Sequence, residues 1–198
     1  MGLQIPNLEG RRLRLEPLAR SHSTGMFELW RDPAVCEHSG PALDSRGQPI
    51  RLPAASHRDS DRLLEYWLDR ARDRTGLRWA VVLADRSEFA GAVGFNSLGA
   101  CSEYAYHFVP RFWGDGLASE ASHVALSWSF SSGSESIEVF IDAANIRSVR
   151  LAERLGFKTV ESPTDQPARY VLNRADHVSF RSEQGGSVER EGRDEPDA

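Results

Sequence analysis

Apolar and polar positions alternate near the start of the chain and then shift to a helical period. Residues 11–18 (RRLRLEPL) alternate charged and apolar side chains, which predicts a half-buried strand. Residues 21–32 then predict a short helix that starts at Ser21 or Ser23 and ends before Pro33. We therefore expect a strand that is followed directly by a helix.

A second helix and a hairpin are predicted further along the chain. Residues 57–74 place apolar side chains on one helical face, namely Leu63, Leu64, Trp67, Leu68 and Ala71. The other positions carry charges of both signs, which is typical of a solvated helix face. Residues 77–84 and 89–98 are rich in β-forming residues and flank the polar residues 85–88, so we expect a hairpin there.

The following segment alternates with a period of two. Residues 102–109 predict a strand with Tyr104, Tyr106 and Phe108 on one face. The opposite face of this strand would carry Glu103, Ala105 and His107. Helical spacing returns at Leu117 and predicts a helix through residue 130.

The last predicted elements are a strand, a helix and a strand. Residues 136–142 form a short apolar run that is typical of a buried strand. Asn145 is a natural N-cap for the next helix, and Gly156 is a natural stop after it. Residues 169–173 predict the final strand. Strands interspersed with helices indicate an α/β (α+β) fold.

The chain length and local composition suggest one domain and a tail. We assign residues 1–180 of the 198 to a single domain. Residues 181–198 have almost nothing to bury and are expected to be a disordered acidic tail. Residues 33–56, rich in Pro, Gly and Ser, predict a long irregular connection. Connections of that length in compact domains tend to be either functional or disordered.

The overall composition excludes several classes of function. A net charge of −5 argues against a nucleic-acid-binding protein, which usually carries a basic surface. No apolar run approaches the ~20 residues that span a bilayer, and the first residues do not resemble a signal peptide. Cys36 and Cys101 match neither a disulfide framework nor a metal-site spacing. We expect a cytoplasmic protein that binds no metal, no membrane and no nucleic acid.

Two glycines interrupt the junction between the strand at residues 102–109 and the helix that follows. Gly114 and Gly116 would let an anion approach backbone N–H groups at the start of a helix, where the helix dipole favours negative charge. Arg111 could add a charge-assisted contact. The segment is neither a Walker loop nor a dinucleotide fingerprint, because Ser119 stands where the latter needs a third glycine. A tight turn without any ligand remains the alternative from spacing alone.

This junction carries a family resemblance. The segment RFWGDG is similar to the R/Q-x-x-G-x-G/A signature of the GNAT N-acetyltransferase superfamily. The wider frame EYAYHFVPRFWGDGLASEA resembles the RimJ/RimL-type branch, the ribosomal-protein N-terminal acetyltransferases and their relatives. The segments RLRLEPL, WRDPAV and NIRSVRLAERLGF match other parts of that branch in the right order. The resemblance covers residues 11–160.

The resemblance implies a fold and a donor site. The fold would be a mixed, strongly twisted sheet of about six or seven strands flanked by helices, with the strands that carry Phe108 and Val139 splayed to admit acyl-CoA. Backbone amides of the glycine junction would hold the CoA pyrophosphate, and Phe108 and Val109 would pair with the pantetheine arm and offer an N–H to the carbonyl oxygen. Asn145 would bind the same arm. The implied donor-binding residues are Phe108, Val109, Arg111, Phe112, Trp113, Gly114, Asp115, Gly116, Leu117, Ala118, Asn145 and Ser148.

The resemblance also implies the chemistry. Acetyl-CoA would be the cosubstrate, and a primary amine, either a protein N-terminus or a small molecule, would attack it directly. Glu103 would be the base, directly or through water, and His107 could substitute for it. Ser148 would donate a proton or a hydrogen bond to the CoA sulfur. The alternatives without a catalytic role are that Glu103 is only a solvated strand residue and that Ser148 only supports the start of its helix.

Three positions depart from the family pattern. Many members place a tyrosine seven residues after the asparagine, where this chain has Ala152. Asp115 replaces a common lysine beside the expected pyrophosphate, and Ala105 replaces the usual glycine before Tyr106. A catalytically degenerate acyl-CoA sensor or docking module is therefore the alternative to an enzyme, and a phosphate-binding regulator unrelated to CoA is a third. Monomer and homodimer are both compatible with the sequence.

Overall fold

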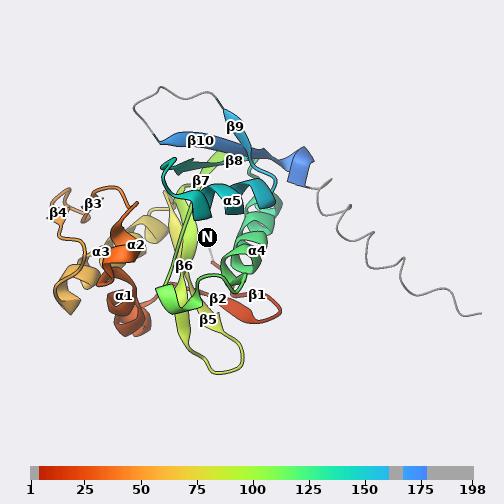
Figure 1. Ribbon diagram of the computed structural model, residues 1–198. Helices are drawn as coiled ribbons and strands as arrows, with labels where there is room; N and C mark the ends of the chain where they lie inside the picture. The colour runs from red at the N-terminus through yellow and green to blue at the C-terminus, as the bar shows by residue number, and fades with distance from the viewer. Residues whose placement is uncertain (1–4, 161–166, 178–198) are drawn as a thin grey trace, which may run out of the picture.

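The computed structural model describes residues 5–160 and 167–177, so the predicted tail at residues 181–198 lies outside the described residues. Its main feature is an eight-stranded sheet in the order β1-β2-β5-β6-β7-β8-β10-β9 (Figure 1). Neighbouring strands are antiparallel except for β7 and β8, which are parallel. The strands are β1 (Leu8–Glu9), β2 (Leu13–Pro17), β5 (Leu77–Leu83), β6 (Phe89–Ser97), β7 (Cys101–Phe108), β8 (Ser136–Ile141), β9 (Lys158–Val160) and β10 (Ala168–Asn173).

Helices flank the sheet on two sides. Figure 1 shows α1, α2 and α3 on one side and α4 and α5 on the other. The helices are α1 (Ser23–Trp30), α2 (Pro33–Cys36), α3 (His57–Arg72), α4 (Leu117–Ser131) and α5 (Ile146–Arg154). None of the helices in the described part of the chain is long and apolar enough to cross a bilayer.

Aromatic side chains fix α4 on the sheet. Trp79 of β5 and Phe95 of β6 are fully buried, and the ring of Trp128 from α4 lies 4.9 Å and 6.2 Å from them. Such large rings dominate the apolar area that a core removes from water. These contacts hold the C-terminal half of α4 against β5 and β6.

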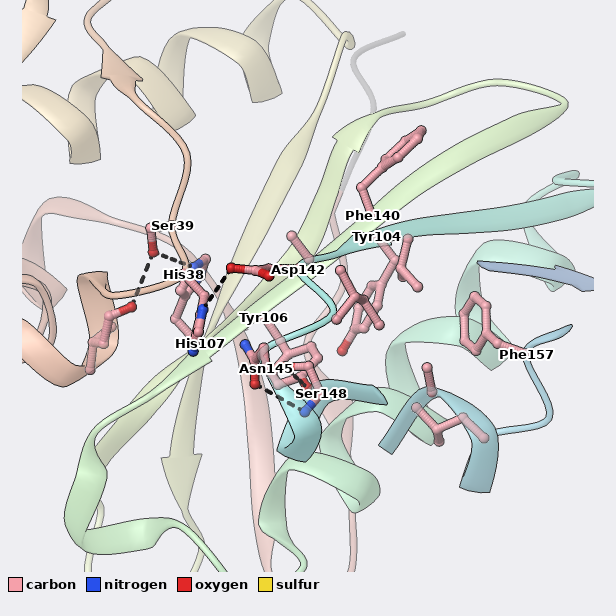
Figure 2. Close-up of a pocket in the computed structure, with 16 residues that line it drawn as sticks. His38, Ser39, Tyr104, Tyr106, His107, Phe140, Asp142, Asn145, Ser148 and Phe157 are labelled. Carbon is pink, nitrogen blue, oxygen red and sulfur yellow. Dashed lines mark hydrogen bonds and ion pairs between the residues drawn. The ribbon is translucent and has the colours of Figure 1, made fainter. Parts of the chain in front are cut away.

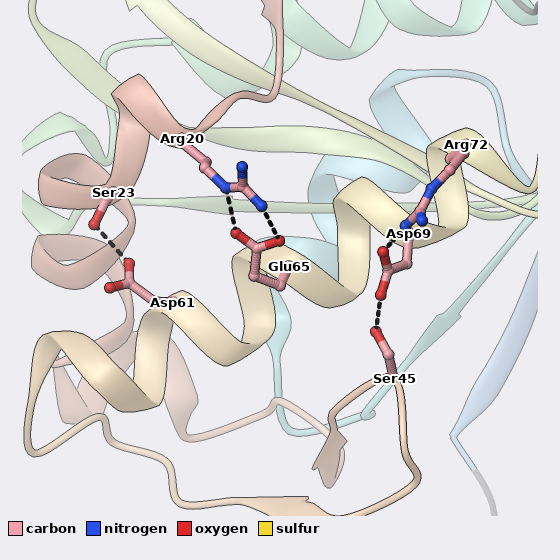
Figure 3. A network of polar contacts seen from close by, with 7 residues as sticks. All are labelled: Arg20, Ser23, Ser45, Asp61, Glu65, Asp69 and Arg72. Atoms are coloured by element: carbon pink, nitrogen blue, oxygen red, sulfur yellow. Dashed lines mark hydrogen bonds and ion pairs between the residues drawn. The ribbon is translucent and has the colours of Figure 1, made fainter.

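Polar contacts along α3 hold the other layer together (Figure 3). Glu65 accepts hydrogen bonds from Arg20 at 2.7 and 2.9 Å, and Asp61 accepts one from Ser23 at 2.6 Å. Asp69 accepts a hydrogen bond from Ser45. The helix face that the sequence presents as solvated thus also ties α1 and the connection after α2 to α3.

The parallel ladder between β7 and β8 is short. It consists of Cys101 with Ser136, Ser102 with Ile137, and Glu103 with Glu138. Beyond Glu103, β7 stays paired with β6 and β8 stays paired with β10, but β7 and β8 no longer pair with each other. The strands separate where the sequence resemblance implied a splayed pair.

Most predicted elements are confirmed, and the differences concern short ones. The region at residues 33–56 is not wholly irregular, because it contains α2 and a small hairpin of β3 (Ala42–Leu43) and β4 (Pro49–Ile50). The sheet has eight strands rather than six or seven because β1 and β9 join its two edges. Strands of two and three residues are too short to show a periodic pattern.

Candidate active site

The two glycines form a left-handed turn at the start of α4. Gly114 has φ +90° and Gly116 has φ +76°, a region that other residues enter only with strain. The described residues supply no hydrogen-bond acceptor for the backbone N–H groups of residues 114–119. The first N–H groups of a helix have no partner within it, and together with the dipole they attract anions. This part of the junction is a cradle that suits a phosphate group.

Arg12 fixes the position of this cradle. Its backbone N–H and its Nε donate to the Glu120 carboxylate at 2.7 and 2.8 Å, and its Nη1 donates to the Asp115 carbonyl oxygen at 2.9 Å. Burial raises the pKa of Glu120, but the hydrogen bonds from Arg12 outweigh it and the net pKa is lowered. Glu120 therefore stays ionised and anchors the first turn of α4.

An outer cavity of about 780 Å³ lies between the cradle and α5. Phe112, Trp113 and Ala118, all predicted donor-binding residues, line it on the cradle side. On the α5 side it is lined by Arg147, Arg150 and Arg154, which the sequence reasoning missed. The spacing of these arginines, three and four residues apart, puts them on one helix face and could have indicated this positively charged surface from the sequence.

An inner cavity of about 140 Å³ continues from the outer one and reaches both faces of the sheet. Tyr104 and Tyr106 face the α4–α5 layer, since their hydroxyls donate to Ser122 of α4 and Ser148 of α5. His107 faces the other layer, because its ring packs 4.6 Å from that of Trp30 in α1. Both tyrosines and His107 line the cavity, so it passes between the separated strands (Figure 2).

The backbone of β7 presents polar groups to this opening. Val109 donates its N–H to Ala90 at 2.9 Å, on the β6 side. Because bonding alternates along an antiparallel pair, the peptide groups of Tyr106 and Phe108 point the opposite way, toward the gap. The Phe108 carbonyl oxygen accepts from Trp113 Nε1 at 2.7 Å, whereas the described residues give the Phe108 N–H no partner. Of the two predicted strand-end residues, only Phe108 has a free N–H.

The polar residues on the α5 side are connected. Asn145 caps α5 by accepting from the Ser148 N–H at 3.2 Å, as predicted. Tyr106 donates to Ser148 Oγ at 2.9 Å, so the hydroxyl proton of Ser148 is free to point into the cavity. Burial raises the pKa of Tyr106, which keeps its hydroxyl protonated and donating.

The opposite side of the inner cavity carries two histidines. His38 Nδ1 lies within hydrogen-bonding distance of the Asp142 carboxylate, at 3.0 Å, and both residues line the cavity. Ser39 donates to the Val35 carbonyl oxygen, so its Oγ accepts from His107 Nε2, 3.4 Å away, and His107 Nδ1 keeps a lone pair. Burial, followed by the nearby Arg78, lowers the pKa of His107 to about 3. This imidazole is neutral and accepts hydrogen bonds at ordinary pH.

Glu103 lies next to this site rather than at its surface. It occupies the same β7 face as His107, at the last pair of the parallel ladder. Asn96 donates to its carboxylate, and Arg78 donates to Asn96. Glu103 is not among the side chains that line either cavity.

Two of the predicted donor-binding residues point away from the outer cavity. Arg111 donates to Glu88 at 2.8 Å and stacks on Phe112, and its side chain does not line the outer cavity. Asp115 contributes its carbonyl oxygen to Arg12 and is likewise absent from the lining. Leu117 is buried at the base of the cradle, where it can offer only its backbone N–H.

Residues 12–158 match the family model described as "Acetyltransferase (GNAT) domain". The chain belongs to the GNAT acetyltransferase family. It is 25% identical over 159 residues to the uncharacterized N-acetyltransferase YoaA of Bacillus subtilis (strain 168), across 78% of this chain and 84% of that protein.

Solved structures show the same GNAT fold. One is a protein from Vibrio cholerae assigned provisionally as a ribosomal-protein-serine acetyltransferase, with a TM-score of 0.70 and 14% identity over 87% of this chain and 99% of that chain. Another is a variant of SpeG spermidine N-acetyltransferase from Vibrio cholerae, with a TM-score of 0.67 and 18% identity over 84% of this chain and 96% of that chain. The likeness at this identity concerns the fold.

As a GNAT domain, the protein is an acetyl-CoA-dependent acetyltransferase. The residues present fit that cosubstrate, because the unpartnered N–H groups of residues 114–119 and the arginines of α5 suit its phosphates. The free N–H of Phe108 faces the gap between β7 and β8, where an extended arm could pair with the strand.

Proposed function

We propose that the protein transfers an acetyl group from acetyl-CoA to a primary amine, either a protein N-terminus or a small-molecule amine, by direct attack. The inner cavity carries this proposal, because it opens to both faces of the sheet. A donor on the α4–α5 side and an acceptor on the α1–α2 side would meet between β7 and β8. No covalent intermediate on the protein is needed.

On the donor side, each group has a defined task. The amides of residues 114–119 bind the pyrophosphate, and Arg147, Arg150 and Arg154 add positive charge along the outer cavity. The Phe108 N–H faces the gap and binds the thioester carbonyl oxygen, where it stabilises the charge that develops on that oxygen. Acetyl-CoA supplies the acyl group in an activated thioester.

On the acceptor side, His107 binds the amine and Glu103 takes the proton that the amine loses. His107 Nδ1 accepts a hydrogen bond from the amine, while its pKa of about 3 makes it a poor base. Glu103 lies on the same face of β7 as His107 and is therefore near the amine. Since its carboxylate does not line the cavity, it takes the proton through a water molecule. The new C–N bond forms as the C–S bond breaks, and the Ser148 hydroxyl stabilises the leaving thiolate, which then takes a proton from water. A free thiol pKa of about 8.5 means that this step needs little further help.

Within the family, we place the chain in the RimJ/RimL-type branch and in the cytoplasm. The segments EYAYHFVPRFWGDGLASEA and NIRSVRLAERLGF and one structural neighbour support the branch. The spermidine N-acetyltransferase among the neighbours makes a small cationic amine the second acceptor class to try.

Thiol release from acetyl-CoA tests this function. The acceptor panel contains N-terminal peptides, polyamines, amino sugars and aminoglycosides, and Glu103→Gln is compared with the wild type. Glu138→Gln is the matched control, since Glu138 pairs with Glu103 across the ladder but lines neither cavity. We expect release with one acceptor class, reduced at least about tenfold in Glu103→Gln alone. Binding of acetyl-CoA without release to any amine would contradict the proposal and favour a sensor.

A further inference from the structure

One side of the inner cavity, at the C-terminal end of α5, is apolar. It is lined by Val139 and Ile141 of β8, by Ala152 of α5, and by Leu155 and Phe157, which follow α5. In Figure 2, Phe157 lies at the opposite side of the cavity from His38 and Ser39. The cavity thus has a polar side, formed by α2 together with Asn145 and Ser148 at the start of α5, and an apolar side at the end of α5.

The small side chain of Ala152 leaves room at the apolar side. Ala152 is the smallest of the α5 residues that line this cavity. The cavity as a whole has about 140 Å³, and a cavity of about 150 Å³ lined by Leu, Ile and Phe is large enough to hold benzene. Part of this volume lies against Ala152, whose methyl side chain leaves more room than the larger apolar side chains around it.

No charged side chain of the described residues lines this apolar side. The histidines and the carboxylate of the inner cavity, His38, His107 and Asp142, belong to its other side, and Arg154 lines the outer cavity. The hydroxyl of Tyr104 is already bonded to Ser122. A carboxylate placed here would lose its hydration without gaining a charged partner in the apolar lining, whereas a hydrocarbon chain would gain from burial.

We propose that this apolar side holds the acyl chain of the donor and accepts neutral aliphatic chains longer than acetyl, such as propionyl and butyryl, in preference to an anionic chain such as succinyl. The proposal rests on the proposed function, because it assumes that the donor lies on the α4–α5 side. It adds a donor specificity that the acetyl transfer itself does not require.

Calorimetric titration of the wild type with acetyl-, propionyl-, butyryl- and succinyl-CoA measures the preference without any acceptor. Each added methylene that becomes buried is expected to tighten Kd about fourfold, which corresponds to about 0.8 kcal/mol. Succinyl-CoA is expected to bind at least about tenfold more weakly than butyryl-CoA. Thiol release with the same donors and an active amine gives the second readout.

Ala152→Val and Ala152→Leu fill the apolar side in two steps. We expect butyryl-CoA binding to fall about tenfold or more in the leucine variant and less in the valine variant, with acetyl-CoA binding within about twofold of wild type. Ala71→Leu is the matched control, because Ala71 lies on α3 and lines neither cavity. The valine variant and the wild-type series remain informative if the leucine variant does not fold.

The outcomes separate this inference from the proposed function. The inference would be overturned if butyryl-CoA bound no better than acetyl-CoA, or if succinyl-CoA bound best. The proposed function would still stand in either case, provided that acetyl-CoA binds and reacts. An equal loss of all donors in the Ala152 variants would overturn the inference as well. A protein that binds no acyl-CoA would refute both.

Discussion

The Tyr106 hydroxyl donates a hydrogen bond to Ser148 Oγ at 2.9 Å and so connects β7 to α5 beside the gap in the sheet. The bond occupies one acceptor position of Ser148 Oγ and leaves the hydroxyl proton of Ser148 free. Because burial raises the pKa of Tyr106, the tyrosine keeps its proton and remains the donor of this hydrogen bond.

Tyr106→Phe is expected to lower kcat about threefold to tenfold with little change in the KM for acetyl-CoA, because an orienting hydrogen bond of about 1 kcal/mol is lost. Ser148→Ala should lower kcat about tenfold. The double variant should be little worse than Ser148→Ala, since the two residues act as a unit. Steady-state thiol release measures all three.

Tyr104→Phe is the matched control for that series. It removes a hydroxyl from the same face of the same strand, where Tyr104 bonds to Ser122 at 2.9 Å. We expect it to cost about 1 kcal/mol of stability and to leave kcat unchanged. A kcat loss equal to that of Tyr106→Phe would show that the effect comes from packing.

Gly114→Ala tests the phosphate cradle. Gly114 and Gly133 both have positive φ, and a Cβ added at either would meet nothing within 4 Å. Each substitution should therefore cost about 1 kcal/mol of stability for backbone strain alone. Only Gly114→Ala should also raise the KM for acetyl-CoA, by about tenfold. Equal KM values in the two variants would contradict the assignment of the cradle.

Arg147→Gln and Arg150→Gln test the positive charge of α5. Each is expected to raise the KM for acetyl-CoA about threefold to tenfold at low salt, and the effect should shrink at high salt because exposed charges are screened. Arg46→Gln, on the exposed hairpin between β3 and β4, should leave KM unchanged. A salt-independent rise in KM would indicate a loss of packing instead.

His107 should make folding stability depend on pH. Its pKa of about 3 lies below the usual 6.5, so the unfolded chain binds the extra proton between these values. Stability is therefore complete above about pH 6.5 and decreases as the pH falls toward 3. Urea midpoints at pH 7 and pH 4.5 should differ more for the wild type than for His107→Gln. If the two proteins showed the same difference in urea midpoint between pH 7 and pH 4.5, the pKa of His107 would not be lowered by folding.

Local features of the site could be predicted from the sequence. The glycine turn and the Asn145 cap are determined by neighbouring residues, so their patterns are visible in the chain. The alternation of Tyr104 and Tyr106 against His107 followed from the strand period, and the register confirms it.

Other features depend on residues far apart in the chain, and the sequence could not show them. The partner of Tyr106 lies 42 positions away, and that of His38 lies 104 positions away. Arg111 was expected to face the cradle, but the β5–β6 turn places Glu88 within its reach. The interaction of Glu103 with Asn96 likewise depends on how β6 and β7 are aligned.

The short ladder between β7 and β8 divides the sheet into two parts that are joined by few backbone pairs. Strands β8, β10 and β9 form one part of the sheet, which leads into α5 and Ser148, while β1, β2, β5, β6 and β7 form the other, which carries Tyr106 and Phe108. Three residue pairs join the two parts. The width of the gap is thus set at Cys101–Glu103 and Ser136–Glu138, and of these six residues Glu103 alone has a proposed chemical role. Evolution or design can therefore adapt the gap to bulkier substrates by substitutions at the other five positions, which leave the proposed reactive side chains unchanged.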